Sequence, residues 1–550
     1  MVKQIKNRGR RNFVKGISLA LAGVNSGHAR LLANGAITEL KFDLQRRDPA
    51  SGNLVVSTET LDPRKIGIIV VDMWNYHWCQ TCLARAGALV PRMNAAFDRA
   101  RWLGMQVVFL PTDVVLTYHE SPQRQAVLAM KQKAIPPRLN INPPNALYPD
   151  YPYCECGPGP QCQQNYGWTA MNPTLQIREN DLIANGEHEV YDICVARGLN
   201  HLLFAGIATN ICLLGKPGAA SNMLRDGLTC MFARDLTDAF STYDPEHGFT
   251  PDRGTAEAIA AIEQSAMPSI DLVSTLRKAG GWGDGLVADP VLVTPWGRMF
   301  EDAVRVMLSS PKTPGASIHY TLDGSEPTES STVYSEPFTV QQTCTLKAVG
   351  FYRGRNITLP STAQYIRLPA PPPKADVYLS DLAPTSAKVG WPFNHNKGPG
   401  IDRSIAGQAL TVRGKEYKKG LGGHSVTELV YDIKPQYRRF VASGGIDEEI
   451  LGNDLGRFRV CLPGVVFKVY VDDKLVAQSP LMRIQYVPWP FDIEIPPGSR
   501  QLKLVIDDPA NGYDALLSPS YPESYRDWWW TSASQFGHAD WLEAGFVTNA

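Results

Sequence analysis

The chain has 550 residues, too many for a single hydrophobic core, and about three or four domains are expected. Lys and Arg together number 54, as do Asp and Glu, so the net charge is zero. This balance argues against binding of nucleic acid or of an anionic membrane by the charge of the whole chain. No run of about 18 apolar residues occurs, so we predict no transmembrane helix.

The N-terminus is basic and then apolar. Residues 1–15 hold six basic side chains and no acid, and the short apolar run 16–24 follows. The pair Arg10-Arg11 resembles a twin-arginine export signal. We therefore predict that residues 1–34 are a signal peptide and that the protein is exported, to the periplasm or the cell surface. An ordinary basic amphipathic helix is the alternative.

Residues 35–275 alternate apolar β-rich runs with helical patterns. Such alternation, with continuous apolar strands, favours a three-layer α/β domain with a parallel sheet covered on both faces. The predicted strands lie at 66–71, 105–110, 201–205 and 229–233, and the predicted helices at 91–103, 216–226 and 254–265.

Two all-β domains are predicted after this region. A Gly/Trp/Asp-rich linker spans 276–288, and residues 289–367 are rich in strands and turns. A stiff Pro-rich linker at 368–375 leads into 376–550, which is again β-rich. We predict a β-sandwich for the first block and a jelly roll for the second.

Five cysteines crowd two segments of the α/β part. In an exported protein they are candidates for a disulfide clip, for a thiolate zinc site, or for unpaired thiols, and their spacing is not that of a standard zinc module. These cysteines are Cys79, Cys82, Cys154, Cys156 and Cys162.

Two residues with catalytic chemistry follow predicted strands. Asp72 comes directly after the strand 66–71, and Cys212 follows the strand 201–205 and a short turn, at the start of a helix. Backbone N–H groups at such a helix start favour a thiolate, and those of Ala208 and Cys212 are candidates to receive an oxyanion. Asp72 is a candidate base for the thiol proton. The alternative is a buried apolar Cys212 and a helix-capping Asp72.

The segments Ile69-Val-Val-Asp-Met-Trp-Asn75 and Gly206-Ile-Ala-Thr-Asn-Ile-Cys212 resemble the two signatures of the isochorismatase-like cysteine hydrolases. The resemblance covers residues 64–275. It implies a triad of Asp, Lys and Cys, a cis peptide within Gly206–Thr209, and hydrolysis of C–N bonds in small amides. By this resemblance Asp72 is the base and Cys212 the nucleophile.

One departure from that family concerns its lysine. Ungapped alignment places Glu179 at the lysine position, and no lysine occurs between Lys133 and Lys216. We expect Lys216 to point elsewhere on the helix that follows Cys212. Without a cation, Asp72 and a thiolate repel each other. An α/β domain without activity, serving as a scaffold, is therefore the alternative to an amidase.

The resemblance also implies a possible metal site, because related nicotinamidases bind zinc through an Asp-x-His pair. Asp113 stands at the comparable strand end, but Val115 replaces the histidine. Asp113, His119 and His77 are candidates for a divalent metal such as zinc, and a polar pocket without metal is the alternative. The hydrolase reading itself needs no cofactor.

The two β-rich blocks resemble carbohydrate-handling modules. Residues 289–367, with Ile318-His-Tyr-Thr-Leu-Asp-Gly-Ser-Glu-Pro-Thr328, resemble the small sandwich at the C-terminus of chitobiases. Residues 376–550, with Tyr417-Lys-Lys-Gly-Leu-Gly-Gly-His-Ser425, resemble the NPCBM carbohydrate-binding module, a galactose-binding-like jelly roll. Flat aromatic rings bind sugar faces, and carboxylates bind hydroxyls. The candidate sugar contacts are Trp391, His424, Asp447, Asp540 and Trp541, with core or hydrogen-bonding roles as the alternative.

Together these patterns predict an exported cysteine hydrolase that acts on a small or glycan-linked amide and is tethered to carbohydrate. Its expected partners are that substrate and a glycan, without nucleic acid and without an integral membrane segment. Association of like chains is left open.

Overall fold

The structure is a computed structural model of the chain. It describes residues 37–75, 77, 79–143, 154–157, 168, 170–265, 267–280, 290–311, 315–352, 354–356, 358, 360–390, 398–451, 464–482, 484, 486–507 and 537–548. The side chains of residues 112, 113, 450 and 451 are outside this description. The predicted signal peptide, residues 1–34, lies outside it as well.

An eight-stranded sheet forms the centre of the N-terminal part, in the order β2-β1-β8-β7-β6-β3-β4-β5. Strands β3 to β8 run parallel, and β1 pairs antiparallel with both β2 and β8. The bounds are β1 Leu40–Arg47, β2 Leu54–Leu61, β3 Ile66–Val71, β4 Gln106–Leu110, β5 Leu182–Ile183, β6 His201–Ile207, β7 Thr229–Asp238 and β8 Ser269–Ile270.

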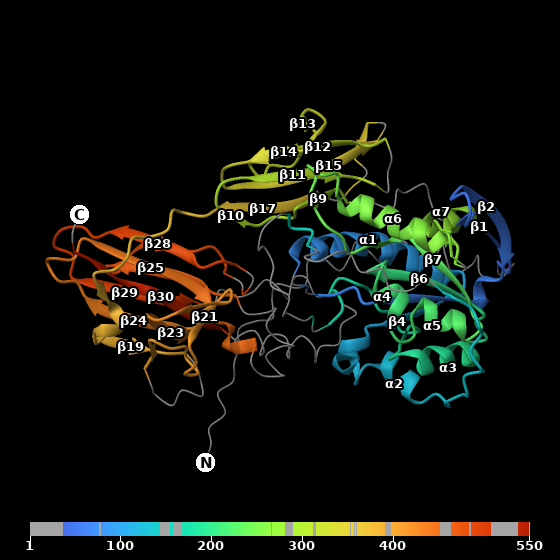
Figure 1. Cartoon of the computed structure of the whole chain (residues 1–550), viewed down its shortest axis with the longest axis horizontal. Helices are drawn as coiled ribbons and strands as arrows, with labels where there is room; N and C mark the ends of the chain where they lie inside the picture. Colours follow the sequence, from blue (N-terminus) through green and yellow to red (C-terminus); the bar gives the residue numbers. More distant parts are fainter. Residues whose placement is uncertain are drawn as a thin grey trace, which may run out of the picture.

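Helices cover both faces of this sheet, so the predicted three-layer α/β fold is confirmed (Figure 1). Helices α1, α6 and α7 lie on one face, and α3, α4 and α5 on the other. All six residues of β3 are buried, as a strand between two helical layers requires. The bounds are α1 Gln80–Trp102, α2 Pro122–Leu128, α3 Glu187–Arg197, α4 Cys212–Gly215, α5 Ala220–Arg225, α6 Pro251–Glu263 and α7 Leu272–Lys278.

A β-sandwich follows, as predicted. One sheet has the order β10-β17-β15-β12-β13, with β16 beside β15, and the other has the order β14-β11-β9. The bounds are β9 Leu292–Thr294, β10 Met299–Phe300, β11 Val304–Ser309, β12 Ser317–Thr321, β13 Thr332–Val333, β14 Phe338–Val340, β15 Cys344–Tyr352, β16 Arg355–Asn356 and β17 Ser361–Arg367. Hydrogen bonds join this sandwich to the α/β part, among them one from Trp296 N–H to Thr81 Oγ1 at 3.0 Å.

The C-terminal part is a second sandwich of two sheets, in the orders β20-β23-β30-β25-β28 and β19-β24-β29-β26-β27 (Figure 1). β18 pairs with β30, and β21 and β22 form a separate hairpin. The bounds are β18 Val377–Tyr378, β19 Ser386–Lys388, β20 Gly400–Ile401, β21 Leu410–Val412, β22 Lys415–Tyr417, β23 Gly420–His424, β24 Thr427–Asp432, β25 Arg439–Ile446, β26 Val466–Val471, β27 Lys474–Gln478, β28 Trp489–Glu494, β29 Gln501–Asp507 and β30 His538–Val547.

Candidate active site and candidate sugar site

The carboxyl ends of β3 and β6 meet at one edge of the sheet. Val71 is paired with Gly206 in the parallel register, so Asp72 lies beside the turn that leads to Cys212. The two backbones approach closely here, because a Cβ on Gly206 would come within 2.1 Å of Val71 O. Gly206 also has a φ of +110°, which other residues rarely adopt. The sheet thus brings the two predicted catalytic residues together.

The turn between β6 and α4 presents backbone donors to the thiol. The Ile207–Ala208 peptide is cis, as the resemblance implied for this turn. The Ala208 N–H donates a hydrogen bond to the Cys212 sulfur. Thr209 anchors the turn, since its N–H donates to Asp238 O at 3.0 Å. Cys212 follows as the first residue of α4 and is buried.

Lys216 completes the site, contrary to our expectation that it points elsewhere. Its ammonium nitrogen lies 2.8 Å from Asp72 Oδ1, and its side chain is 16% exposed. The site therefore contains a lysine, an aspartate and a cysteine. The repulsion that we expected between Asp72 and a thiolate is offset by this cation.

Lys216 reaches Asp72 because the helix stops before it. α4 ends at Gly215 after a single turn, and Lys216 has the extended backbone angles φ −67° and ψ 153°. Pro217 and Gly218 follow, and Gly218 has a positive φ. The predicted helix 216–226 begins only at Ala220. Proline and glycine break helices, so Pro217 and Gly218 were the signal in the sequence for this turn. The prediction of a continuous helix over 216–226 was wrong.

Glu179 does not belong to this site. It is exposed, in the turn that precedes β5. Leu182 at the start of β5 pairs with Val108 of β4, so Glu179 lies toward the amino ends of the parallel strands. Asp72 stands at their carboxyl ends. The prediction that Glu179 occupies the lysine position is therefore wrong, because ungapped alignment takes no account of where each strand starts.

The burial of Cys212 and the groups next to its thiol set its charge state. Burial raises the pKa of the thiol well above its ordinary value, and the negative charge of Asp72 raises it further. The ammonium group of Lys216 and the Ala208 N–H act in the opposite direction. A hydrogen bond between the thiol and Asp72 also favours the protonated sulfur. At rest the site therefore holds a neutral thiol next to its base.

Aromatic rings line the site on one side. Trp168 lies 5.4 Å from the Lys216 ammonium nitrogen, measured to the ring centre. Trp74 stacks on Trp168 at 4.9 Å and on His77 at 4.6 Å, and the Phe240 ring meets His77 edge-on at 5.1 Å. We call these four residues the aromatic wall. No site role was predicted for Trp74, Trp168 or Phe240, because the last two lie far from Trp74 along the chain.

Two of the three predicted metal ligands, His77 and His119, lie in different surroundings. His77 is buried in the aromatic wall, where burial lowers its pKa to about 3, and its Nδ1 accepts the Cys79 N–H at 3.0 Å. His119 is exposed at the end of a 3₁₀ turn, with its Nε2 3.7 Å from Glu120. The side chain of Asp113 lies outside the description. His77 is thus a packed neutral ring within the aromatic wall.

Trp541 is not a sugar platform. It is fully buried between the sheets of the C-terminal sandwich, with the ring of Phe467 at 4.9 Å and that of Phe491 at 5.2 Å. A ring with no exposed face cannot stack on a sugar, so this prediction is wrong, and the alternative core role is correct. Trp391 lies outside the described residues.

His424, Asp447 and Asp540 are also buried, at one end of the sheet that contains β23, β25 and β30. Burial raises the pKa of Asp540, and the nearby carboxylates of Asp447 and Glu449 raise it further. His424 Nδ1 lies 2.7 Å from the Ser425 carbonyl oxygen. These contacts are internal, and the candidate sugar-binding role of the three residues remains a prediction.

A histidine–carboxylate pair that was not predicted from the sequence lies next to these residues. His538 Nδ1 lies 2.6 Å from Glu449 Oε1, and the two side chains are 10% and 3% exposed. The His424 ring meets the His538 ring edge-on at 5.2 Å. Imidazole and carboxylate groups thus gather at this end of the sandwich.

Comparison with known families supports the reading of the β-rich part. Residues 375–516 match the NPCBM/NEW2 domain, and residues 295–362 match the chitobiase/beta-hexosaminidase C-terminal domain. The C-terminal part of the chain therefore carries two modules of carbohydrate-associated families, one of them a carbohydrate-binding module. No helix among the described residues is long and apolar enough to cross a membrane.

A curated relative covers only a part of the chain. Over 150 residues the chain is 31% identical to a predicted endo-alpha-N-acetylgalactosaminidase of Renibacterium salmoninarum. The match spans 25% of this chain and 9% of the relative's length.

Solved structures resemble separate parts of the chain. The CBM51 module of Clostridium perfringens GH95, solved with methyl-galactose, is 26% identical, covering 31% of this chain and 99% of that one, with a TM-score of 0.23. An isochorismatase-family protein of Burkholderia thailandensis is 17% identical, covering 40% and 97%, with a TM-score of 0.22. N-carbamoylsarcosine amidase of Thermoplasma acidophilum is 15% identical, covering 37% and 95%, with a TM-score of 0.21.

Proposed function

We propose that this protein is an exported cysteine hydrolase of the isochorismatase-like type, which cleaves an amide C–N bond and is held on carbohydrate by its C-terminal modules. The observation that carries the proposal is the 2.8 Å contact of Lys216 with Asp72 beside Cys212. A base, a cation and a thiol at one sheet edge are the groups that nucleophilic acyl transfer needs.

In the first step Asp72 takes the proton of the Cys212 thiol, and the sulfur attacks the amide carbonyl carbon. The oxyanion that forms is placed to receive the N–H groups of Ala208 and Cys212. When the C–N bond breaks, the protonated Asp72 returns the proton to the leaving nitrogen. A thioester and a free amine, or ammonia, result.

In the second step water cleaves the thioester. Asp72 takes a proton from the water, the hydroxide adds to the carbonyl carbon, and the C–S bond breaks. The proton then returns to the Cys212 sulfur, which restores the thiol. Lys216 pairs with the Asp72 carboxylate at 2.8 Å and offsets the repulsion between this carboxylate and a thiolate.

The α4 helix contributes less to thiol activation than we expected from the sequence. It spans only Cys212–Gly215, and a single turn has a small dipole. The positive charge of Lys216 takes over this role. The aromatic wall beside Lys216 suits a small substrate with a flat or apolar portion.

The C-terminal modules support the carbohydrate part of the proposal. A protein that is exported and that carries carbohydrate-associated modules meets its substrate on a glycan-bearing surface. The amide is then one that is attached to such a glycan or released near it.

The experiment is a screen of small amides and amino-sugar amides, in which ammonia or amine release by the whole chain is measured. Cys212→Ser is expected to lower the rate by at least about a thousandfold, and Lys216→Met by about a hundredfold. The matched controls are Lys131→Met, at an exposed lysine, and Glu179→Gln, at the exposed carboxyl; both keep wild-type activity.

A rate that survives Cys212→Ser unchanged would contradict the nucleophile. A Glu179→Gln variant that loses activity while Lys216→Met retains it would contradict the assignment of the cation. The alternative is an inactive α/β domain in a carbohydrate-binding or scaffold protein, which a missing lysine and the added glycan modules favoured; the position of Lys216 weakens the first of these two arguments. Folded protein without hydrolysis of any amide in the screen would favour the scaffold instead.

A further inference from the structure

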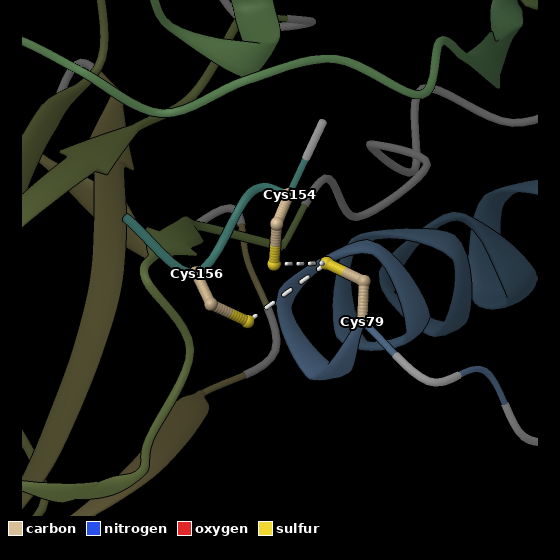
Figure 2. A group of neighbouring side chains, drawn as sticks. All are labelled: Cys79, Cys154 and Cys156. Atoms are coloured by element: carbon tan, nitrogen blue, oxygen red, sulfur yellow. Dashed lines mark hydrogen bonds between the residues drawn. The ribbon is translucent and has the colours of Figure 1, made fainter. Parts of the chain in front are cut away.

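Three cysteine sulfurs converge outside the candidate active site (Figure 2). The sulfur of Cys79 lies 3.7 Å from that of Cys154 and 3.8 Å from that of Cys156, and all three are within 4.8 Å of one another. Cys79 caps the N-terminus of α1, and the other two belong to the segment 154–157. We call this group the thiol cluster.

The spacing fits a metal better than a disulfide. A tetrahedral zinc site with Zn–S bonds of about 2.3 Å places its sulfurs about 3.8 Å apart. A disulfide would need one pair to close to about 2.05 Å and would leave the third sulfur without a role. Both measured contacts of Cys79 match the edge of the metal tetrahedron.

Hydrogen-bond donors are directed at the sulfurs. The Cys82 N–H lies 3.5 Å from the Cys79 sulfur. The Thr81 hydroxyl accepts the Trp296 N–H at 3.0 Å, so its own proton is available for the Cys156 sulfur at 3.4 Å. Donors of this kind stabilise metal-bound thiolates. The N-terminus of the 23-residue helix α1 adds a positive potential at Cys79.

The segment 154–157 is held so that its two thiols face Cys79 (Figure 2). Glu155, between them, is fully buried, and its carboxylate accepts the Ser241 N–H at 3.0 Å. Its other oxygen lies 3.8 Å from Arg85 Nε. Arg298 of the sandwich donates a hydrogen bond to the Cys156 carbonyl. The segment 154–157 thus has fixed partners from α1, from the residues that follow β7, and from the sandwich side.

We propose that Cys79, Cys154 and Cys156 bind one zinc ion as three thiolates, with water or one further side chain as the fourth ligand. On binding, three S–H groups lose their protons to solvent and three Zn–S bonds form. The ion ties the segment 154–157 to the start of α1, beside the residues that connect the α/β part with the sandwich. Thiolate ligands favour zinc among the common divalent metals, and the site is independent of the proposed hydrolysis.

The test is the metal content of the whole chain, purified without chelator and measured by elemental mass spectrometry. We expect one zinc per chain, and a fall of at least about tenfold in Cys79→Ser and in Cys156→Ser. The control variants Cys82→Ala, in the same C-x-x-C motif, and Cys344→Ser, in the sandwich, keep the metal. Zinc that persists in both ligand variants would place the ion elsewhere and overturn the proposal.

A second measurement needs no variant. Cobalt(II) added to metal-free wild-type chain is expected to give a sulfur-to-cobalt charge-transfer band and the strong visible bands of a tetrahedral site. Zinc is expected to protect the Cys79, Cys154 and Cys156 peptides from alkylation, and a chelator to remove the protection. A disulfide between any two of the three, found by peptide mapping without reduction, would overturn the proposal. So would thiols that stay reactive with stoichiometric zinc present.

Discussion

The protonation of Cys212 depends on two side chains of opposite charge. Asp72 raises the pKa of the thiol and Lys216 lowers it, while burial raises it most. Burial and Asp72 therefore favour the neutral thiol, and Lys216 favours the thiolate. Lys216 lies 2.8 Å from the same carboxylate, so one cation serves both the base and the nucleophile.

Burial also acts on a pair of carboxyl groups in the C-terminal sandwich, those of Asp447 and Asp540. Burial raises the pKa of Asp540, and Asp447 and Glu449 raise it further. Neighbouring negative charges in a buried place oppose the ionisation of Asp540. This arrangement suits an internal link better than a sugar contact.

At the scale of elements, the active site depends on how closely β3 and β6 approach. We predict that Gly206→Ala destabilises the α/β part by about 2–3 kcal/mol or more, since the added Cβ would meet Val71 O at 2.1 Å. Gly198→Ala is the matched control. Gly198 also has a positive φ, but no atom lies within 4 Å of its added Cβ, and a loss of about 1 kcal/mol is expected.

Hydrogen exchange of the β3 and β6 amides, followed by mass spectrometry of the whole chain, measures the local stability of these two strands in both variants. The amides of Gly206→Ala should exchange faster than those of Gly198→Ala. Equal exchange in the two variants would mean that the strands can separate without loss, and would contradict the close approach.

The elements that could be predicted from the sequence are those with strong periodicity. The strands at 66–71, 105–110, 201–205 and 229–233 are present, because continuous apolar runs bounded by helical patterns specify buried parallel strands. Asp72 and Cys212 were found for the same reason, since each follows such a strand. Lys216 was missed because its role depends on one broken helical turn, which apolar periodicity does not record.

The aromatic wall and the thiol cluster were out of reach for a different reason. Trp168 contacts Trp74, and Cys156 contacts Cys79, in each case a residue about 75 to 95 positions earlier in the chain. Only the fold brings the members of each pair together. From the sequence, five cysteines could be named as candidates for a disulfide clip or a metal site. Which three of them lie together could not be predicted. Trp541 was misjudged because an exposed ring and a core ring look alike in a sequence.

At the scale of the whole molecule, an α/β domain and two regions that match carbohydrate-associated families share one chain. We predict that the modules bind glycan independently of the catalytic thiol. On a glycan array the whole chain and its Cys212→Ser variant should therefore give the same pattern and the same signal. Binding that disappears in Cys212→Ser would place the glycan in the α/β site, and folded chain that binds no glycan would contradict the tether.

The most direct test of the central claim is the pH dependence of Cys212 alkylation in the intact chain, followed by mass spectrometry of its peptide. It needs no substrate. Asp72→Asn removes a negative charge and should lower the thiol pKa, so alkylation at a given pH becomes faster than in wild type. Lys216→Met removes the cation and should raise the pKa, so alkylation becomes slower. The account predicts this order of the three proteins. Identical profiles, or a Lys216→Met profile equal to wild type, would contradict a site built from Asp72, Lys216 and Cys212.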